Sequence, residues 1–235
     1  MKCAYRIYFG GDCVIKIAID GPSGAGKSTL SKCLAKELGF VYIDTGAMYR
    51  AAGLHCLREN INIKENSSMA ADAVDKITID INYSPEKGQK VILNGDDVTD
   101  EIRTPEVSIA ASDVSAIKRV RLKLVELQRE LSKSHNVLMD GRDIGTYVLP
   151  DADIKIFLTA SNEERARRRH LELLEKGQKC EYEDVLKDMI YRDKNDSSRE
   201  FAPLKAAEDS ITVDTTGNTF EESFELLLNL IKERL

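Results

Sequence analysis

The sequence of 235 residues contains no apolar run that approaches the roughly 20 residues needed to span a bilayer. Its five cysteines are odd in number and scattered, with no C-x-x-C pair, which argues against a zinc site or a disulfide framework. It also lacks an excess of positive charge, since the net charge is −6, so any basic site has to be local. We therefore expect a cytoplasmic protein with reduced thiols that acts on neither membranes nor nucleic acid.

The composition is that of a globular chain. Apolar residues make up 42% and charged residues 31%, which is not the balance of a disordered protein. The length allows one domain with an insertion, and we expect that domain to cover residues 14–235. Residues 1–13 have too short an apolar part for a secretory signal. We interpret them as an N-terminal extension, either a strand or a disordered tail.

One stretch organises the rest of the chain. It is a G-x-x-x-x-G-K-[ST] motif made of Gly21, Pro22, Ser23, Gly24, Ala25, Gly26, Lys27 and Ser28. An apolar run over residues 14–20 precedes it and predicts a buried strand. Leu30, Leu34 and Leu38 recur at helical spacing after it, and Gly39 would end that helix. A strand before and a helix after are the context in which this motif binds phosphate, and they argue against a chance glycine-rich turn.

The residue types of this phosphate loop suit a nucleoside triphosphate. Glycines let the backbone curl so that successive N–H groups face one anion, and the helix start adds its positive dipole end. Lys27 can reach the β- and γ-phosphates, and the Ser28 hydroxyl can join the ligands of Mg²⁺.

Strands and helices are predicted to alternate along most of the chain. The predicted strands cover residues 14–20, 40–43, 137–139, 154–158 and 211–213. The predicted helices cover residues 29–38, 47–59, 105–115, 118–134, 161–176, 182–193 and 219–234, with loop and a short helix over 60–73. Ser161 with Glu164, and Thr219 with Glu222, predict capping boxes. Such alternation predicts an α/β fold with a parallel sheet covered on both faces.

The period changes in the middle of the chain. Apolar side chains alternate with polar ones over residues 77–83, and residues 85–88 form a turn signal before a second strand at 91–93. Asn94-Gly95 predicts a hairpin turn into a third short strand at 97–99. We predict a small antiparallel β-insert that packs as a flap, because it has little apolar core of its own.

Polar clusters follow three predicted strands. They are the phosphate loop, Asp44-Thr45-Gly46, and the segment 140–143. Ligands of parallel α/β sheets bind at the carboxyl ends of the strands, so these clusters are expected to share one site.

Two of these clusters extend into motifs that resemble a known family. They are Asp44-Thr45-Gly46-Ala47-Met48-Tyr49-Arg50 and Asp140-Gly141-Arg142-Asp143-Ile144-Gly145. Together with the phosphate loop they are similar to motifs of the bacterial cytidylate kinases, which are P-loop nucleoside monophosphate kinases. The agreement continues through residues 150–158, 164–169 and 192–204. The resemblance implies a three-layer α/β/α fold with a five-stranded parallel sheet, a CMP-binding insert at 60–104 and a helical lid at about 161–200.

The resemblance also implies the reaction, which is transfer of the γ-phosphate of ATP to CMP or dCMP with Mg²⁺ bound to ATP. The acceptor is a phosphate that is already ionised at neutral pH, so no general base is needed. The reaction needs two polyanions aligned and their repulsion offset by cations, and arginine supplies bidentate geometry for this. No long apolar face is left over, so we expect a monomer.

Residue roles follow from the resemblance position by position. The implied catalytic residues are Lys27, Arg142, Arg168 and Arg199, and the implied metal ligand is Ser28. The implied ATP-binding residues are Gly21, Pro22, Ser23, Gly24, Ala25, Gly26, Lys27, Ser28, Thr29 and Arg165. The implied CMP-binding residues are Thr45, Gly46, Arg50, Ser112, Arg121, Arg142, Asp143, Arg192, Asp196 and Arg199. Asp20 and Asp140 are left out of the metal ligands, because a strand-terminal aspartate often caps a turn.

The base is implied to be read by Ser112, Arg121 and Asp143. Cytosine presents an amino donor at N4 and acceptors at N3 and O2, which suit an acid or hydroxyl and an arginine. Uracil would oppose a carbonyl to Asp143, at a cost on the order of a few kcal/mol. The alternative is that Ser112 and Arg121 are polar faces of their helices and Asp143 is a cap. Likewise, the arginines at 165–169 could form a solvated face paired with glutamates.

Three other functions stay open. A GTPase is one, because Asp214-Thr215-Thr216-Gly217 matches D-x-x-G, although it follows the last predicted strand and no N-K-x-D is present. A kinase for shikimate, adenylate or thymidylate on the same fold is the second, and a nucleotide-binding module without catalysis is the third. A GTPase would hydrolyse GTP without an acceptor, and a module would show no turnover.

Overall fold

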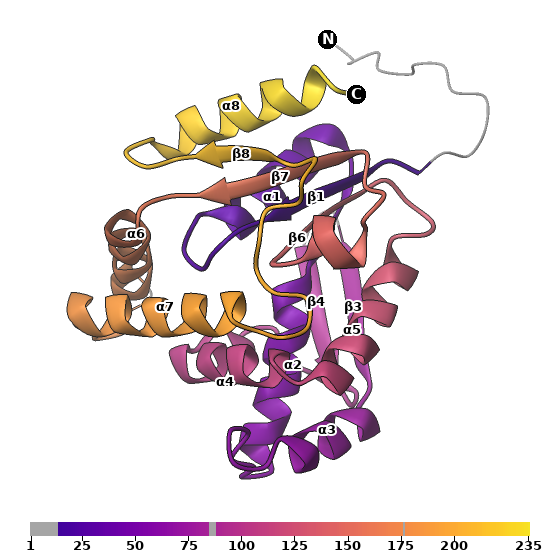
Figure 1. Ribbon diagram of the computed structural model, residues 1–235, viewed down its shortest axis with the longest axis vertical. Helices are drawn as coiled ribbons and strands as arrows, with labels where there is room; N and C mark the ends of the chain where they lie inside the picture. Colours follow the sequence, from indigo (N-terminus) through magenta and orange to yellow (C-terminus); the bar gives the residue numbers. More distant parts are fainter. Residues whose placement is uncertain (1–13, 85–87, 176) are drawn as a thin grey trace.

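The computed structural model describes residues 14–84, 88–175 and 177–235, and Figure 1 shows how they are arranged. Parallel strands form a five-stranded central sheet in the order β2-β6-β1-β7-β8. Their bounds are Lys16–Asp20 for β1, Val41–Asp44 for β2, Val137–Gly141 for β6, Ile154–Thr159 for β7 and Ile211–Asp214 for β8. The predicted fold class and its five parallel strands are therefore confirmed.

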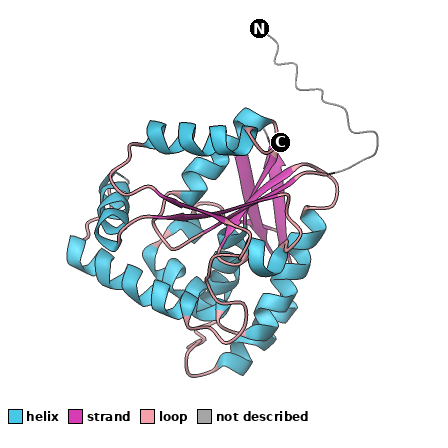
Figure 2. Ribbon diagram, turned by 45° about the horizontal axis from the view of Figure 1, so that its top comes forward, coloured by secondary structure: helices cyan, strands magenta, loops and turns pink. Residues whose placement is uncertain are grey.

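Helices surround this sheet, as Figure 2 shows in cyan around the magenta strands. Their bounds are Lys27–Leu38 for α1, Thr45–Arg58 for α2, Ser67–Lys76 for α3, Pro105–Ser115 for α4, Lys118–Leu131 for α5, Asn162–Glu175 for α6, Tyr182–Ser197 for α7 and Phe220–Lys232 for α8. Two shorter turns are η1, a 3₁₀ turn at Glu101–Arg103, and η2, a π-helical turn at Ile144–Val148. None of the helices in the described ranges combines the length and the apolar character that crossing a membrane requires.

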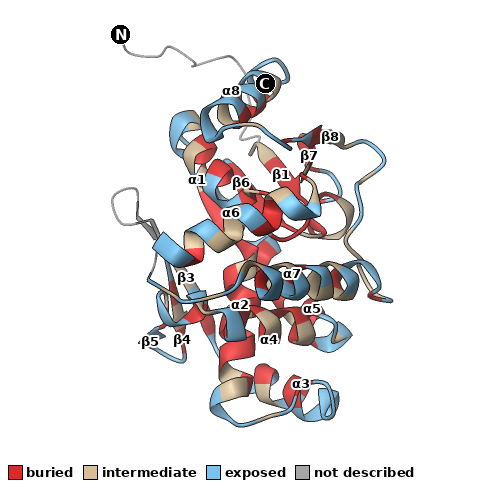
Figure 3. Cartoon of the chain, turned by 90° about the vertical axis from the view of Figure 1, so that its left-hand side faces the viewer, coloured by how far each residue is buried: buried red, intermediate tan, exposed pale blue. Residues whose placement is uncertain are grey.

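The two faces of the sheet build two cores. Successive side chains of a strand point to opposite faces, so Ile17 and Ile19 of β1 pack on one face with Leu34 of α1 and Leu227 of α8. Ala18 packs on the other face in a larger core shared with α2, α4 and α5. Figure 3 shows the buried residues in red running through the sheet and α2. Burial on both faces explains why these strands read as continuous apolar runs.

The predicted β-insert is confirmed as an antiparallel sheet in the order β3-β4-β5, at Ile79–Ser84, Gly88–Leu93 and Asp96–Asp97. The positive φ angles of Asn94 and Gly95, 52° and 93°, are those that a tight hairpin turn needs. Val91 and Leu93 join the large core beside α2, so the insert packs on the domain, as predicted. The turn predicted at 85–88 falls mostly outside the described residues, and the third strand starts one residue before its predicted position.

Several helix boundaries differ from the predictions. α2 starts at Thr45 instead of residue 47, because the Asp44 Oδ1 atom accepts a hydrogen bond from the Ala47 N–H at 3.0 Å and caps the helix. α3 extends to Lys76, beyond the loop and short helix expected for 60–73. α7 runs to Ser197 instead of 193, which places four more residues on one rigid element.

The two predicted capping boxes have different outcomes. At α8 the box is complete, since Thr219 accepts from the Glu222 N–H and the Glu222 carboxylate accepts from the Thr219 N–H. At α6 only half of it forms, because the Glu164 N–H donates to Ser161 Oγ at 3.2 Å while the Ser161 N–H donates to Thr216 Oγ1 at 2.9 Å. The α6 box was therefore wrong in its second half, and the reason is that arginines of the same helix take the Glu164 carboxylate.

The helices α6 and α7 form a small layer of their own beside the carboxyl end of the sheet (Figure 1). They share a separate apolar cluster of Ala166, Leu173, Val185 and Met189. This pair coincides with the predicted lid, whose boundaries stay a prediction.

Candidate active site

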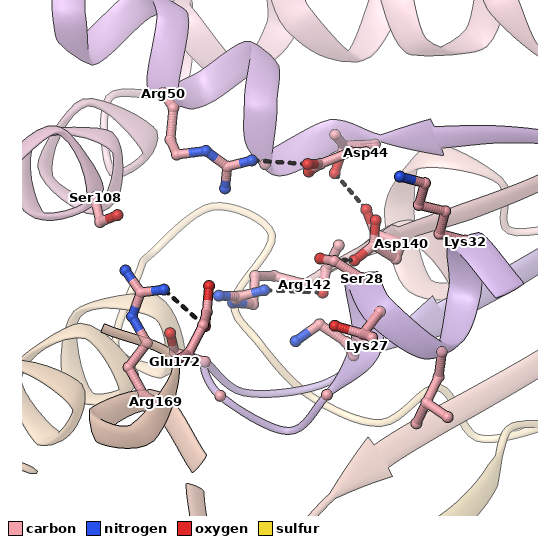
Figure 4. Close-up of a pocket in the computed structure, with 18 of the residues that line it drawn as sticks. Lys27, Ser28, Lys32, Asp44, Arg50, Ser108, Asp140, Arg142, Arg169 and Glu172 are labelled. Atoms are coloured by element: carbon pink, nitrogen blue, oxygen red, sulfur yellow. Dashed lines mark hydrogen bonds and ion pairs between the residues drawn. The ribbon is translucent and has the colours of Figure 1, made fainter. Parts of the chain in front are cut away.

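A cavity of about 1380 Å³ opens at the carboxyl ends of β1, β2 and β6 and extends between α4, α6 and α7. Residues of the phosphate loop, of the Asp44 motif and of the Asp140 motif all line it. Figure 4 shows Lys27, Ser28, Asp140 and Arg142 close together, with the Arg50–Asp44 pair opposite. The expectation that the three clusters share one site is therefore confirmed.

The phosphate loop depends on close backbone approach. Gly24 and Gly26 have φ angles of 74° and 83°, in the left-handed region that glycine tolerates. A Cβ atom on Gly24 would lie 2.6 Å from Met189 Cε, and one on Gly21 would lie 1.9 Å from the Leu158 carbonyl oxygen. The loop is thus wedged between the sheet and α7, with no room for side chains at these positions.

Lys27 begins α1 and is buried inside the loop. Its Nζ atom donates to the Pro22 carbonyl oxygen at 2.6 Å. Burial, with a further contribution from Arg142, lowers the pKa of Lys27 well below its usual value. A nearby polyanion would reverse this shift, which is the electrostatic setting of a phosphate-binding lysine.

Ser28 lies against Asp140 at the end of β6. The Ser28 hydroxyl donates to Asp140 Oδ2 at 2.8 Å, and the Tyr42 hydroxyl donates to Asp140 Oδ1 at 3.0 Å. Burial, reinforced by Asp44, raises the pKa of Asp140 to about 6. Hydroxyl and carboxylate oxygens are ligands that suit Mg²⁺, which usually takes few protein ligands and completes its shell with substrate phosphates and water. Accordingly, the described residues hold no cluster of three or more His, Cys, Asp or Glu side chains that could bind a metal alone.

Three arginines in the opposite part of the cavity are oriented by two aspartates. Arg50 and Arg103 both bind Asp44 Oδ2, at 2.8 Å and 3.1 Å, and Arg142 Nε binds Asp196 Oδ2 at 2.9 Å. Burial would raise the pKa of Asp44, but Arg50 and Arg103 hold it below its usual value. This carboxylate therefore stays ionised and fixes two guanidinium groups.

Several buried guanidinium nitrogens in this cavity have no partner. The Nε atoms of Arg50, Arg121, Arg192 and Arg199 are buried without a hydrogen-bond acceptor. Burial lowers the pKa of Arg192 to about 10, and the neighbouring Arg142 adds to the effect. A buried, positively charged donor without an acceptor costs free energy. The concentration of such donors around one cavity therefore indicates an anionic ligand.

The three residues expected to read a base lie together and are buried. The Arg121 side chain is 1% exposed, donates to the Ser115 carbonyl oxygen at 3.2 Å, and makes a close ion pair with Asp143. Ser112 donates to Asp196 Oδ1 at 3.3 Å and is 6% exposed. Neither Ser112 nor Arg121 therefore lies on a solvent-exposed face of its helix, and their role in reading a base stays a prediction.

The arginines of α6 point in different directions. Arg168 lines the cavity and reaches the Thr215 Oγ1 atom at 3.1 Å, and Arg169 lines it beside Glu172. Arg165 is buried outside the cavity lining, where it donates to the Ser23 carbonyl oxygen at 2.6 Å and pairs with Asp193 at 2.7 Å. It thus braces the phosphate loop from behind.

The other expected residues can be placed in the same way. Every residue expected to bind CMP or to take part in catalysis lines the cavity. Of those expected to bind ATP, the cavity lining includes Ser23, Gly24, Gly26, Lys27, Ser28 and Thr29 but not Gly21, Pro22, Ala25 and Arg165. The Asp214 carboxylate accepts from the Thr216 N–H at 2.8 Å, so the D-x-x-G match forms a turn.

Sequence reasoning missed several residues that line the cavity. Arg103 is one, and no motif marks it because it follows the β-insert instead of a strand of the main sheet. Gln89 of β4 is another, since its side chain accepts from the Asp44 N–H at 2.9 Å. Asp44 was quoted within a motif but given no role, although an aspartate at a strand end that precedes an arginine by six residues could have suggested the pair.

Comparisons with known proteins show which family the chain resembles. The family model for cytidylate kinase matches residues 17–233. The cytidylate kinase of Caldicellulosiruptor saccharolyticus is 56% identical over 216 residues, which cover 92% of this chain and 95% of that protein. The cytidylate kinase of Carboxydothermus hydrogenoformans is 51% identical over 217 residues, 92% of this chain and 97% of that protein. Among solved structures, an uncharacterized protein from Eubacterium ventriosum has a similar fold, with a TM-score of 0.52 and 14% identity over 94% of this chain and 100% of that one.

Proposed function

The chain belongs to the cytidylate kinase family, and on that premise we propose that it transfers the γ-phosphate of ATP to CMP or dCMP, giving ADP and CDP or dCDP. The observation that carries the proposal is the meeting of two anion-binding arrangements in one cavity. Lys27 and the loop amides form the first, and Arg50, Arg142, Arg192 and Arg199 form the second. A hydrolase would need only the first.

Transfer requires that donor and acceptor phosphates approach despite their repulsion. In the proposed mechanism Lys27 and the loop amides bind the β- and γ-phosphates of ATP, and Arg142 and Arg199 bind the phosphate of CMP. Arg168, which reaches the cavity from α6, would offset charge on the transferred group. The acceptor oxygen is already ionised, so the mechanism assigns no general base.

Mg²⁺ is part of the proposal. Ser28 would hold the ion directly, and the adjacent Asp140 carboxylate supports the same place, because both offer hard oxygen ligands. The ion would offset negative charge on the donor phosphates.

The choice of cytosine rests on the Arg121–Asp143 pair and Ser112. Asp143 is an acceptor for the N4 amino group, and Arg121 is a donor for N3 and O2. Uracil and thymine lack the amino group and would leave Asp143 facing a carbonyl.

Further expectations stay part of the proposal. Residues 161–200 would close over the nucleotides and exclude water, and residues 60–104 would contribute to the acceptor site. We also propose a monomer in the cytoplasm, where free thiols such as those of Cys33, Cys56 and Cys180 stay reduced.

A coupled assay of ADP release across CMP, dCMP, UMP, AMP, TMP and shikimate tests the function. We expect turnover with CMP and dCMP to exceed that with each other acceptor by at least about tenfold in kcat/KM. Faster turnover with AMP, TMP or shikimate would reassign the substrate. Hydrolysis of GTP or ATP at the same rate without any acceptor would contradict a kinase.

A further inference from the structure

The helices α7 and α4 lie side by side (Figures 1 and 3). Residues of both helices line the acceptor part of the cavity. α7 carries Arg192 and Asp196, and α4 carries Ser112. The distance between the two helices therefore sets how far the sugar- and phosphate-facing groups stand from the base-facing groups. Contacts that fix α7 against α4 therefore also fix the relative positions of Arg192, Asp196 and Ser112.

Two hydrogen bonds between the two helices involve Ser112, a residue of the site itself. Ser112 Oγ donates to Asp196 Oδ1 at 3.3 Å, and Asn195 Nδ2 donates to Ser112 Oγ at 2.9 Å. Just beyond α7, Arg199 donates to Ser115 Oγ at 3.0 Å. An acceptor nucleotide would compete for several of these groups, so they cannot hold the helices at a constant distance in both the free and the bound protein.

One contact between the helices lies outside the cavity lining. The Tyr191 hydroxyl donates to Asp113 Oδ1. Tyr191 directly precedes Arg192 on α7, and Asp113 directly follows Ser112 on α4, and both neighbours line the cavity. Lys64, from the segment before α3, contacts both residues of this pair. Its Nζ atom lies 3.8 Å from Asp113 Oδ2 and 4.5 Å from the centre of the Tyr191 ring.

The surroundings keep this contact intact near neutral pH. Burial, with the adjacent Asp113, raises the pKa of Tyr191, so the phenol stays a donor. The Asp113 side chain is 11% exposed, and Lys64 is the cation that faces it. A partly buried hydrogen bond to a carboxylate is stronger than one between neutral groups.

We propose that Tyr191, acting through Asp113, is a positioning residue that docks α7 on α4 and so places Arg192 and Asp196 against the acceptor nucleotide. The inference rests on the proposed function. Losing the docking bond lowers the fraction of molecules whose acceptor site is assembled, and apparent affinity falls by that fraction. The phosphate loop also contacts α7, at Met189 and Asp193. Its backbone path is nevertheless fixed between β1 and α1, so we expect affinity for ATP to change less than affinity for CMP.

The test is Tyr191→Phe, which removes only the hydroxyl. We expect KM for CMP to rise about three- to tenfold, the size of one hydrogen bond, with kcat and KM for ATP within about twofold of wild type. Titration calorimetry with CMP alone should show the same loss of affinity. Tyr182→Phe is the matched control, because Tyr182 lies on the same helix and its hydroxyl makes only an exposed 3.5 Å contact with the Glu163 carbonyl oxygen.

Variants of Asp113 separate positioning from general stability. Asp113→Asn keeps an oxygen that accepts from Tyr191 and should retain most of the affinity for CMP, whereas Asp113→Ala should resemble Tyr191→Phe. The double variant Y191F/D113A should be no worse than either single variant, since both remove one contact. Thermal unfolding is measured for each, so that a loss of folded protein is not read as a loss of affinity.

Three results would overturn the inference. A KM for CMP in Tyr191→Phe that matches Tyr182→Phe would remove the docking role. Equal rises in KM for CMP and ATP would indicate a structural effect on the whole lid. Additive losses in the double variant would show that the two residues do not act together. If the wild-type protein instead fails to phosphorylate CMP while ATP and CMP still bind, the proposed function fails, and the calorimetric comparison still tests the docking role.

Discussion

The phosphate loop and the acceptor side reach the same cavity by different routes. The loop is one uninterrupted stretch between β1 and α1, and its proposed binding groups are backbone amides with a single lysine. The acceptor side collects Arg50 from α2, Arg121 from α5, Arg142 after β6 and Arg199 after α7. Its groups are side chains whose positions depend on how distant elements pack.

The difference shows in how each side holds its charges. The loop offers backbone amides and one cation whose pKa is lowered by burial. On the acceptor side, Asp44, Asp143 and Asp196 each hold at least one arginine, and these pairs pre-orient the guanidinium groups. A local substitution should therefore impair the loop by itself, whereas one on the acceptor side should also disturb its ion-pair partner.

The largest expected effect comes from removing the lysine of the loop. Lys27→Ala should lower kcat about a hundred- to a thousandfold, because the variant loses the positive charge that is positioned beside the transferred phosphate. The far-UV circular dichroism should not change, since alanine keeps the helical propensity of the first turn of α1. Normal turnover in Lys27→Ala would remove the phosphate loop from the mechanism.

The matching change on the acceptor side is Arg142→Met. We expect kcat/KM for CMP to fall roughly a hundredfold, with KM for ATP within a few-fold, because one cation on the acceptor phosphate is lost and Asp196 loses its partner. Arg119→Met is the control. Arg119 is exposed, lies outside the cavity lining and pairs with Asp72 at an N–O distance of 2.6 Å. If KM for ATP rose as much as KM for CMP, Arg142 would belong to the donor side.

Base selection should respond to Asp143. In Asp143→Ala the preference for CMP over UMP is expected to shrink by about ten- to a hundredfold, more than ATP binding weakens, because the acceptor opposite N4 is lost. The buried Arg121 loses its partner, so the unfolding free energy should also fall by about 3–5 kcal/mol. Asp143→Asn keeps the shape and can donate to a carbonyl, so it should relax the preference with a smaller loss of stability. Unchanged discrimination in both variants would refute the assignment.

A backbone change tests the loop more gently. Gly24→Ala should raise KM for ATP about tenfold, because the added Cβ would lie 2.6 Å from Met189 Cε at a φ of 74°. Gly39→Ala shares the positive φ, 70°, but meets no atom within 4 Å, so it should lose stability without changing KM for ATP. Equal effects of the two variants on KM would mean that backbone strain alone matters.

The smallest expected effect is on the pH dependence of stability. Asp20 joins the two sides, because its carboxylate accepts from the Ile144 and Gly145 N–H groups, both at 2.7 Å. Burial raises the pKa of Asp20 from 3.8 to about 7, so between these values the folded protein holds a proton that the unfolded chain has released. The unfolding free energy should therefore fall as pH rises through this window, by at most about 1.4 kcal/mol per pH unit from this group. Urea denaturation at several pH values should show a flatter profile for Asp20→Asn.

The sequence predicted the regular elements well and their ends less well. The start of α2 was missed because Asp44, expected to end a strand, also caps the following helix. The capping box at Ser161 was predicted as complete because its two competitors cannot be seen in the local pattern. Thr216, which accepts from the Ser161 N–H, is distant in sequence. Arg168, which binds the Glu164 carboxylate, lies on the same helix, and the sequence does not show which acceptor it takes. Local patterns do not report such competition.

The site likewise contains residues that local patterns predict and residues whose positions depend on tertiary packing. The loop residues could be assigned from spacing alone, since a strand, a glycine-rich turn and a helix start dictate a local backbone path. Arg165 looked like its neighbours on α6 but turns behind the loop, and Arg103 carried no motif at all. Only the packing of α6 and of the β-insert decides where these side chains lie.

The sequence by itself determined the parallel sheet, the phosphate loop and the arginine-bearing motifs, because apolar periodicity and short-range backbone geometry act within a few residues. The tertiary structure alone decided which arginines face the cavity, which aspartates hold them and how Tyr191 ties α7 to α4. Those outcomes depend on electrostatic contacts between segments far apart in the chain, and such contacts exist only after the sheet has brought the segments together.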